Sequence, residues 1–110
     1  MTNTKIQTIS VHELKNRRDA NSNLCLIDVR EPDEWQALRI PGALHMPKAE
    51  LPALIEKTIP DRNCPVYLHC LGGVRSLHAA ESLLQMGYKE VYSIDGGIAE
   101  WEMAGYPIEK

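Results

Sequence analysis

The sequence has 110 residues, which suits one compact domain and leaves little room for a second. Hydrophobic residues make up 44% and charged residues 25% of the chain, values that are ordinary for a globular protein and exclude a disordered or membrane-embedded chain. Twelve Lys and Arg against fifteen Asp and Glu give a formal charge of -3, so we expect no nucleic-acid partner.

The chain opens with a polar stretch. Residues 1–10 contain neither the apolar segment nor the small-residue cleavage site of a secretory signal, and no later run is long enough to span a bilayer. We therefore expect a cytoplasmic protein with no membrane contact. Thr8 and Ile9, at the end of this stretch, predict a short strand.

The first half of the chain alternates between helix and strand patterns. Ser10 and Glu13 have the spacing of a capping box, which predicts a helix from Val11 to Arg18. The apolar run from Leu24 to Val29 is typical of a central strand that is buried on both faces of a parallel sheet. The elements predicted next are a helix from Pro32 to Leu38, a strand from Ala43 to Met46 and a helix from Leu51 to Thr58.

The second half continues this alternation. Pro65 to His69 predicts another buried strand, and the helix that follows it has Leu77, Ala80 and Leu84 on its apolar face and Gly87 as its C-terminal cap. The last predicted elements are a strand from Glu90 to Ile94 and a helix from Ile98 to Ala104, closed by Gly105 and Pro107. The alternation predicts one three-layer α/β domain over residues 1–110, with a mainly parallel sheet flanked by helices.

Cys70 stands where the strand that ends at His69 meets the following helix. Ligands of parallel α/β sheets bind beyond the carboxyl ends of the strands, so this junction is the candidate site. Gly72 and Gly73 let the loop curl, so that amide groups at a helix N-terminus point at the sulfur. Such an N-terminus contributes up to ~2 kcal/mol, which would move the pKa of a free thiol from ~8.5 toward ~7. The thiolate then needs no neighbouring base, and the side chain of His69 should point to the opposite face.

The other cysteines and the histidines carry weaker signals. Cys25 lies in an apolar run and is expected in the core, whereas Cys64 lies six residues before Cys70, roughly 20 Å away along a strand and beyond disulfide reach. The uneven spacing, without a CxxC pair, predicts reduced thiols and neither a metal nor another cofactor. No metal-ligand spacing links the remaining histidines, which we expect at the surface or at the mouth of the site: His12, His45 and His78.

Four pieces of the chain, taken in order, match one family. They are Leu26 to Glu31 (LIDVRE), Ile40 to Ala43 (IPGA), Cys70 to Ser76 (CLGGVRS) and Tyr92 to Gly97 (YSIDGG), followed by Trp101. With these pieces the chain resembles the rhodanese-like domain over nearly its whole length. The resemblance implies a five-stranded parallel α/β domain. It also implies a sulfurtransferase whose cysteine takes a sulfane sulfur from thiosulfate or another donor and passes it to a nucleophilic acceptor.

Loop length separates sulfur transfer from related chemistries. The family is similar in fold to certain dual-specificity cell-cycle phosphatases and some arsenate reductases, and the phosphatase-like loop places five residues between Cys and Arg. In this chain four residues separate Cys70 from Arg75. The shorter loop suits one added sulfur atom, so we rank sulfur transfer above phosphatase or arsenate reductase activity.

The predicted mechanism is a double displacement through a Cys70 persulfide. The thiolate attacks the outer sulfur of the donor, and a thiol, cyanide or a partner protein then attacks the persulfide. The loop amides would hold the charge on sulfur, and the residues predicted to bind substrate are Arg75, Leu71, Gly72, Gly73, Val74 and Ser76.

The roles of the charged residues near the loop are open at this point. Arg75 could orient an anionic donor or form a structural salt bridge to a carboxylate such as Asp28 or Glu31. Asp28 and Arg30 are expected to tie the active-site end of the sheet together. The pieces after the last strand are expected to be structural, with a tight turn at Asp95, Gly96 and Gly97 and a core residue at Trp101.

The chain departs from the family's pattern at three positions. Many members that use thiosulfate have a basic residue where this chain has Leu71 and a polar residue where it has Val74. Where the family often has a histidine, this chain has Arg39, which either restores positive charge or faces solvent. The pocket is therefore less cationic than is usual for the family.

Two alternatives from other functional classes remain. One is a non-catalytic interaction module, which the intact Cys70 and the glycine loop disfavour. The other is a carrier that receives sulfur from a partner desulfurase and hands it on, which the sequence does not separate from a free-standing enzyme. The expected partners are a small sulfur donor and a thiol or cyanide acceptor, or a protein in either role.

Overall fold

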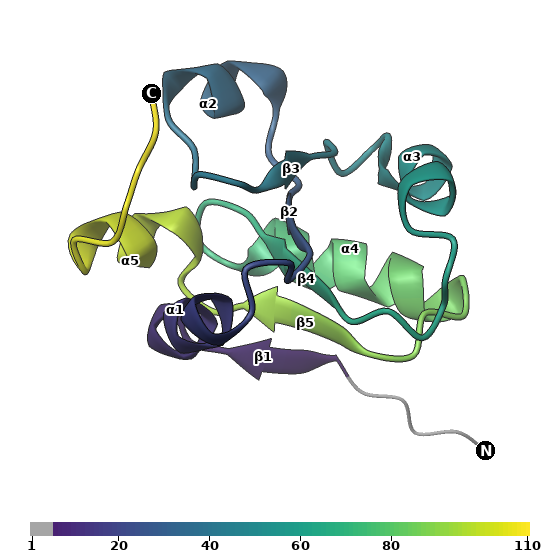
Figure 1. Cartoon of the computed structure of the whole chain (residues 1–110). Helices are drawn as coiled ribbons and strands as arrows, with labels where there is room; N and C mark the ends of the chain where they lie inside the picture. Colours follow the sequence, from purple (N-terminus) through teal and green to yellow (C-terminus); the bar gives the residue numbers. More distant parts are fainter. Residues whose placement is uncertain (1–5) are drawn as a thin grey trace.

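The computed structural model describes residues 6–110 and has five strands and five helices that alternate along the chain (Figure 1). Residues 1–5, and with them half of the polar opening stretch, lie outside the described residues. The strands are β1 (Gln7–Ile9), β2 (Leu26–Asp28), β3 (Leu44–His45), β4 (Val66–His69) and β5 (Val91–Ile94). The helices are α1 (Val11–Ala20), α2 (Pro32–Ala37), α3 (Leu51–Thr58), α4 (Val74–Gln85) and α5 (Gly97–Met103).

The strands form one sheet in the order β1-β5-β4-β2-β3, and every pair in it is parallel. The five-stranded parallel α/β fold predicted above is thus confirmed. The run from Leu24 to Val29, predicted as a central strand buried on both faces, contains β2, which is fully buried and lies inside the sheet between β4 and β3. A continuous apolar run reports burial on both faces, which strands next to the centre share with the central one.

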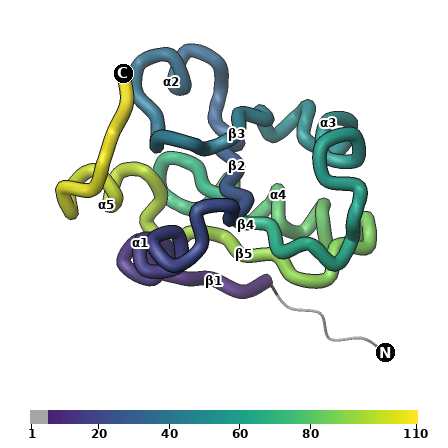
Figure 2. The backbone as a smooth tube through the Cα atoms, in the orientation of Figure 1, coloured from purple at the N-terminus to yellow at the C-terminus, as the bar shows by residue number. Residues whose placement is uncertain are grey.

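Helices cover both faces of the sheet. On one face α1 and α5 pack against apolar side chains from β2, β4 and β5, in a cluster that includes Leu14, Ile98 and Trp101. On the other face α3 and α4 pack against Ile27 and Leu68. Figure 2, which traces the same view as a tube, shows α1 in front of the sheet and α4 behind it. The short helix α2 has no buried residue and lies at one end of the molecule, above β3 (Figure 1).

The predicted capping residues, Ser10 before α1 and Gly87 after α4, agree with the structure. The N–H of Glu13 donates to Ser10 Oγ at 3.1 Å and starts α1, which continues two residues past the predicted end. Gly87 follows α4 with a φ of 96°, a conformation that favours glycine. Its N–H donates to the Leu84 carbonyl and that of Tyr88 to the Leu83 carbonyl, both at 3.1 Å, which is the Schellman pattern.

The predicted apolar face of α4 is displaced around the helix. The buried positions are Ser76, Ala79, Ala80 and Leu83, whereas Leu77 and Leu84 are only half-buried. The reason lies at the first turn, where the hydroxyl of Ser76 contacts Ser93 of β5 at 2.7 Å. A polar residue therefore occupies the inward side of the helix, and an apolar pattern alone gives no sign of it.

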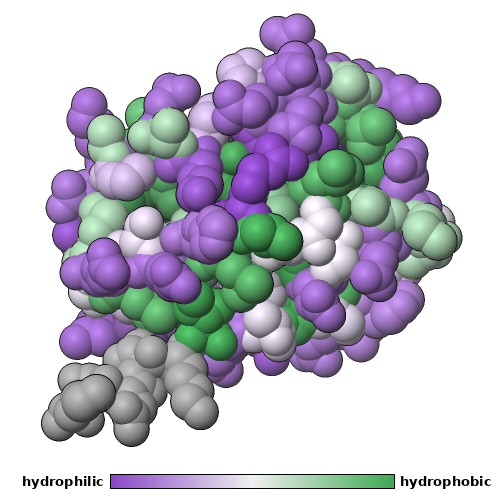
Figure 3. All heavy atoms as spheres, turned by 180° about the vertical axis from the view of Figure 1, so that it is seen from behind, coloured by the Kyte–Doolittle hydropathy of each residue, from purple (hydrophilic) through white to green (hydrophobic). Residues whose placement is uncertain are grey.

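The surface of the described residues is mixed in character. Figure 3, the view from behind Figure 1, shows hydrophobic areas interspersed among hydrophilic side chains. Within residues 6–110, no helix combines the length and the apolar character that a membrane span requires. The large apolar side chains that are exposed are Leu44, Leu71, Val74 and Met103.

Candidate functional site

Cys70 follows the last residue of β4, at the carboxyl end of the central strand. Its side chain packs with the cluster between the sheet and α3 and α4, and the residue is only 1% exposed. The chain then turns through Leu71 and Gly72 to Gly73, which caps α4 with a φ of 118°. This left-handed conformation favours glycine and turns the Gly73 amide toward the sulfur.

Gly73 and Ser76 make the shortest polar contacts to the cysteine sulfur among residues 6–110. The N–H of Gly73 donates to Cys70 Sγ at 3.1 Å, and Ser76 Oγ lies 3.6 Å from the sulfur. Ser76 Oγ is in turn 2.7 Å from Ser93 Oγ. When the sulfur is a thiolate, Ser93 can donate to Ser76, and Ser76 can donate to the sulfur.

These contacts lower the pKa of the Cys70 thiol. Burial alone raises this pKa, but the hydroxyl of Ser76 and the amides of Ser76, Gly73 and Gly72 hydrogen-bond to the sulfur and together outweigh it. The direction agrees with the sequence-based expectation. The partners of the sulfur among residues 6–110 include no histidine, so the thiolate is stabilised here by hydrogen bonds.

His69 lies beside Asp28, away from the cysteine sulfur, as its place in the strand predicts. The side chain is completely buried, and burial lowers the pKa of its imidazole. Its Nε2 is 3.5 Å from Asp28 Oδ2 and has no hydrogen-bond partner among residues 6–110. The Nδ1 atom lies 3.2 Å from the Cys70 carbonyl oxygen, so this ring supports the backbone of the site.

The start of α5 holds the outer side of the loop. The N–H of Ile98 donates to the Cys70 carbonyl at 2.9 Å, and that of Ala99 donates to the Leu71 carbonyl at 3.1 Å. Gly97 has a φ of 55°, and a Cβ atom there would overlap both carbonyl oxygens. The sequence indicated only a tight turn here. The motif YSIDGG marks this segment in the sequence, but the motif alone does not show that Gly97 lies against the cysteine loop, because that contact depends on the tertiary fold.

Arg75 is engaged in an ion pair with α2. Its two terminal nitrogens donate to the two carboxylate oxygens of Glu34, at 2.6 and 2.9 Å. The guanidinium of Arg75, followed by a hydrogen bond from the amide of Glu31, lowers the pKa of Glu34 to about 2 against the effect of burial. The partners suggested from the sequence, Asp28 and Glu31, are wrong. Glu34 takes this position because it is the third residue of a helix that stands over the loop.

The other arginines near this end of the sheet are paired as well. Arg30 donates to both carboxylate oxygens of the buried Asp28 and to the Leu38 carbonyl, as expected for a structural pair. Arg39 pairs with Glu109 at 3.0 Å. The remaining histidines are exposed or half-buried: His12 contacts Tyr106, His78 contacts Lys48, and His45 stacks on Trp35.

Apolar side chains form the rim of the loop. Leu71 is 50% exposed and Val74 is 66% exposed, on either side of the glycines that curl over the sulfur. The structure thus brings together all the residues predicted for the site, Cys70 through Ser76. Arg75 is one of these residues, and its guanidinium forms an ion pair with Glu34.

The other two cysteines lie near the opposite end of the strands. Cys25 was expected in the core but is only half-buried, because it precedes the first residue of β2. Burial raises the pKa of its thiol to about 11. Cys25 and Cys64 line one hollow of about 150 Å³ together with Pro65 and Tyr67. This proximity was not predicted from the sequence.

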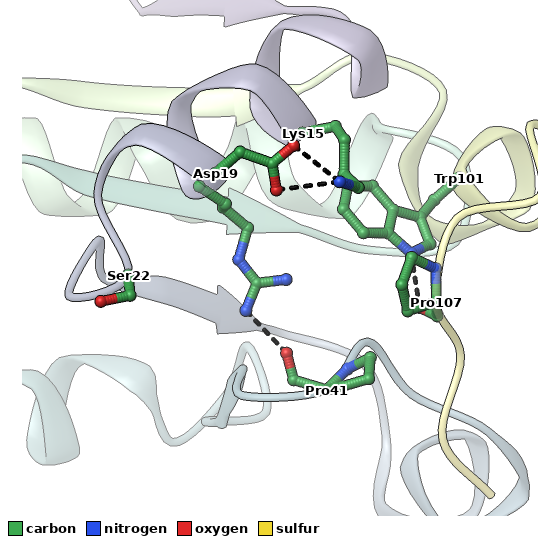
Figure 4. A pocket seen from close by; sticks show the side chains of 7 residues that line it. Lys15, Asp19, Ser22, Pro41, Trp101 and Pro107 are labelled. Carbon is green, nitrogen blue, oxygen red and sulfur yellow. Dashed lines mark hydrogen bonds and ion pairs between the residues drawn. The ribbon is translucent and has the colours of Figure 1, made fainter.

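A larger hollow of about 250 Å³ lies between α1, α5 and the turn at Pro41 (Figure 4). Arg18 reaches across it and donates to the Pro41 carbonyl at 2.6 Å, and Lys15 pairs with Asp19. None of the residues from Cys70 to Ser76 lines it. The hollow is therefore separate from the cysteine loop.

A family model for the rhodanese-like domain matches residues 10–104. The thiosulfate sulfurtransferase GlpE of Coxiella burnetii is 35% identical over 98 residues, which are 89% of this chain and 86% of that protein.

Two solved structures are also similar. A rhodanese-related protein of Thermoplasma volcanium is 31% identical with a TM-score of 0.78, covering 94% of this chain and 97% of the other. A Rhodopseudomonas palustris protein of unknown function, described as a possible tyrosine phosphatase, is 27% identical with a TM-score of 0.87 and coverages of 94% and 85%.

Proposed function

Since this chain belongs to the family of rhodanese-like domains, we propose that it is a sulfurtransferase in which Cys70 carries a sulfane sulfur as a persulfide. The observation that carries the proposal is the hydrogen bonding of the Cys70 sulfur. At a helix N-terminus the amide of Gly73 donates to the sulfur, and the hydroxyl oxygen of Ser76 lies 3.6 Å from it. A thiolate at this position is the nucleophile that sulfur transfer requires.

The transfer takes place in two steps. In the first, the Cys70 thiolate forms a bond to the outer sulfur of the donor, and the bond between that sulfur and the rest of the donor breaks. In the second, a thiol or cyanide attacks the outer sulfur of the persulfide, and Cys70 leaves as a thiolate. The same amides and hydroxyl hydrogen-bond to the thiolate before and after the reaction.

The residues of the loop divide this work. The amides of Gly72, Gly73 and Ser76 and the Ser76 hydroxyl hold negative charge at the sulfur, while Leu71 and Val74 form the entrance. Arg75, paired with Glu34, fixes the start of α4 under α2. No cofactor takes part in this scheme.

The proposal extends to the domain organisation, the compartment and the partners of the protein. We propose one domain over residues 1–110 that acts in the cytoplasm, where thiols stay reduced, and the three cysteines are free in the structure. The donor and the acceptor are small molecules or partner proteins, and a carrier role for a desulfurase uses the same persulfide.

A phosphatase is the alternative with a specific observation behind it, since one similar structure is described as a possible tyrosine phosphatase. The spacing from Cys70 to Arg75 argues against it, because one residue fewer lies between them than in the phosphatase-like loop. In addition, Arg75 donates both terminal nitrogens to Glu34, which leaves it poorly placed to clamp a phosphoryl group.

A turnover assay with matched cysteine variants tests the proposal. Sulfur transfer from a mixed panel of donors (thiosulfate, an alkyl persulfide, a persulfide-loaded cysteine desulfurase) to cyanide should vanish in Cys70→Ser and persist in Cys25→Ser and Cys64→Ser. Hydrolysis of an aryl phosphate at a comparable rate, lost in Cys70→Ser, would favour the phosphatase instead. Sulfur transfer that survives Cys70→Ser would exclude the proposed mechanism.

A further inference from the structure

The charges and the apolar rim around Cys70 indicate which donor the site accepts. We propose that the donor is an alkyl persulfide, R–S–SH, carried by a small thiol or by a protein cysteine, and that the thiosulfate dianion is a poor substrate for this chain. The inference rests on the proposed function, and it adds the class of the donor.

Three arginines near this end of the sheet are paired with carboxylates, so they do not attract a dianion as free cations would. Arg75 is held by both oxygens of Glu34, Arg30 by both oxygens of Asp28, and Arg39 by Glu109. Each pair is neutral as a unit, so its attraction for an approaching anion falls off steeply with distance. These three arginines therefore add no net positive charge that would draw thiosulfate to the sulfur.

One further cation lies near the start of α4. Lys48 has no carboxylate partner among the ion pairs of residues 6–110, and its ammonium is 3.3 Å from His78 Nδ1. His78 lies one helical turn beyond Val74. The free ammonium is thus beside the rim rather than at the sulfur, which is hydrogen-bonded to Gly73 and Ser76.

The depth of the sulfur decides which part of the donor meets the rim. Cys70 is 1% exposed, so only a terminal atom of a donor can reach it, and the remainder must stay at the entrance. The side chains at that entrance are Leu71 and Val74, which are 50% and 66% exposed. An alkyl carbon chain gains from contact with them, whereas the sulfonate end of thiosulfate would lose hydration without gaining a partner.

The balance of charge in the reaction points the same way. With an alkyl persulfide, Cys70–S⁻ and R–S–SH give Cys70–S–SH and R–S⁻: one S–S bond breaks, another forms, and no oxidant or reductant is needed. With thiosulfate, a thiolate must approach a dianion, and sulfite leaves as a second dianion. Three negative charges then meet at a sulfur whose neighbouring arginines are paired with carboxylates, which raises the barrier to the reaction.

The test compares rates of persulfide formation on Cys70, read by intact mass under single-turnover conditions, for thiosulfate and for propane persulfide. In the unmodified protein the second-order rate constant for the alkyl persulfide should exceed that for thiosulfate by at least tenfold at pH 7. Equal rates, or a faster reaction with thiosulfate, would overturn the inference. Failure of every donor to load Cys70 would instead overturn the proposed function, so the two failures are distinct.

A charge placed at the rim provides the matched variant. In Leu71→Lys one positive charge about 6 Å from a dianion is worth about 1.4 kcal/mol in water, so the ratio of thiosulfate to alkyl persulfide rates should rise about tenfold. The rise should shrink at high salt. Gln85→Lys adds the same charge at the exposed far end of α4, about 16 Å along the helix from Val74, and should leave the ratio unchanged. An unchanged ratio in Leu71→Lys, or an equal rise in Gln85→Lys, would contradict the inference.

A third arm separates the two sources of alkyl persulfide. A cysteine desulfurase that carries a persulfide is mixed with the protein, and its rate is compared with that of propane persulfide at the same concentration. A faster reaction with the desulfurase assigns the donor to a partner protein, and a faster reaction with propane persulfide assigns it to a small thiol. Thiosulfate ahead of both would overturn the inference.

Discussion

The pKa of Cys70 is set by groups from three different segments. Burial between the sheet and α4 raises it, and Ser76, Gly73 and Gly72 at the start of α4 lower it by more. Ser93 of β5 holds the Ser76 hydroxyl in place at 2.7 Å. The reactivity of the thiol therefore depends on Ser76, which lies six residues after Cys70 in the chain.

We expect Ser76→Ala to make Cys70 a weaker nucleophile at neutral pH. A hydrogen bond to a charged group contributes about 1.5 kcal/mol, so the rate of alkylation by iodoacetamide at pH 7 should fall about tenfold. The pH profile of alkylation should move to higher pH, because the loss of a donor raises the pKa of the thiol. Ser93→Ala, which keeps the Ser76 hydroxyl, serves as the control and should have a smaller effect. An unchanged profile in Ser76→Ala would show that the amides alone hold the thiolate.

At this scale the candidate nucleophile could be predicted from the sequence, but not all of its surroundings could. Cys70 and its two glycines follow one another in the chain, so their joint role could be derived from local geometry. The partner of Arg75 and the contact of Gly97 with the loop join distant segments, and no spacing in the sequence encodes them.

Two elements, α5 and α2, hold the cysteine loop from outside. The first amides of α5 bind the carbonyls of Cys70 and Leu71, and Glu34 of α2 binds Arg75. The loop itself contributes few apolar contacts, since Leu71 and Val74 face outward. Its shape is therefore maintained by these two polar connections.

Comparing alanine replacements of Gly97 and Gly105 should separate the cost of left-handed backbone strain from the cost of a steric clash with the cysteine loop. Gly97→Ala must place a Cβ against the Cys70 and Leu71 carbonyls in a left-handed backbone, and we expect a loss of about 3 kcal/mol in the free energy of unfolding. Gly105 has a φ of 81° and open space around it, so Gly105→Ala should cost only about 1 kcal/mol. The measurement is urea unfolding of both variants. Equal losses would mean that the approach of α5 to the loop contributes nothing.

The ion pair between α2 and α4 predicts a dependence of stability on pH. The pKa of Glu34 is about 2 in the folded protein, below its ordinary value of 4.5, so the pair stabilises the fold above pH 4.5 and loses this effect as the pH falls toward 2. Glu34→Gln keeps an acceptor for the Glu31 amide but removes the charge. It should lower the free energy of unfolding by about 1 kcal/mol at pH 7, a modest value because both partners are partly solvated.

The same comparison at low pH provides the check. The difference between Glu34→Gln and the unmodified protein should become much smaller at pH 3 when measured by urea unfolding. Asp33→Asn, an exposed neighbour in the same helical turn that forms no ion pair among residues 6–110, should not reproduce the effect. A constant difference across the pH range would assign the effect of Glu34 to packing instead of charge.

The elements themselves were largely readable from the sequence, for physical reasons. Apolar runs, capping residues and glycine stops are local signals, so all ten elements were expected near their observed bounds. The order of the strands, the buried face of α4, the exposure of Cys25 and the partner of Arg75 depend on how the elements pack. The sequence-based description did not give the strand order and differed from the structure at the other three points.

The whole molecule consists of two apolar clusters that share one sheet. Leu83 belongs to the cluster under α3 and α4, and Ile98 belongs to the cluster under α1 and α5. The Cys70 side chain lies in the cluster under α3 and α4, whereas its carbonyl accepts a hydrogen bond from the amide of Ile98, which belongs to the other cluster. The cysteine loop therefore depends on both halves of the core.

We expect the two clusters to unfold together. Leu83→Ala and Ile98→Ala remove fully buried side chains from opposite faces, and each should lower the free energy of unfolding by about 3 kcal/mol. In both variants, urea curves followed by far-UV circular dichroism and by tryptophan fluorescence should coincide, as for a single cooperative domain. Separate transitions would show that the two faces are independent units.

We propose that Cys70 carries the sulfur atom during transfer. The most direct test is the mass of the protein after incubation with a persulfide donor. We predict the gain of one sulfur atom, located by peptide mapping on Cys70, removed by cyanide and absent in Cys70→Ser. An unmodified mass with every donor, or a sulfur atom found on Cys25 or Cys64 while Cys70 stays free, would contradict the account.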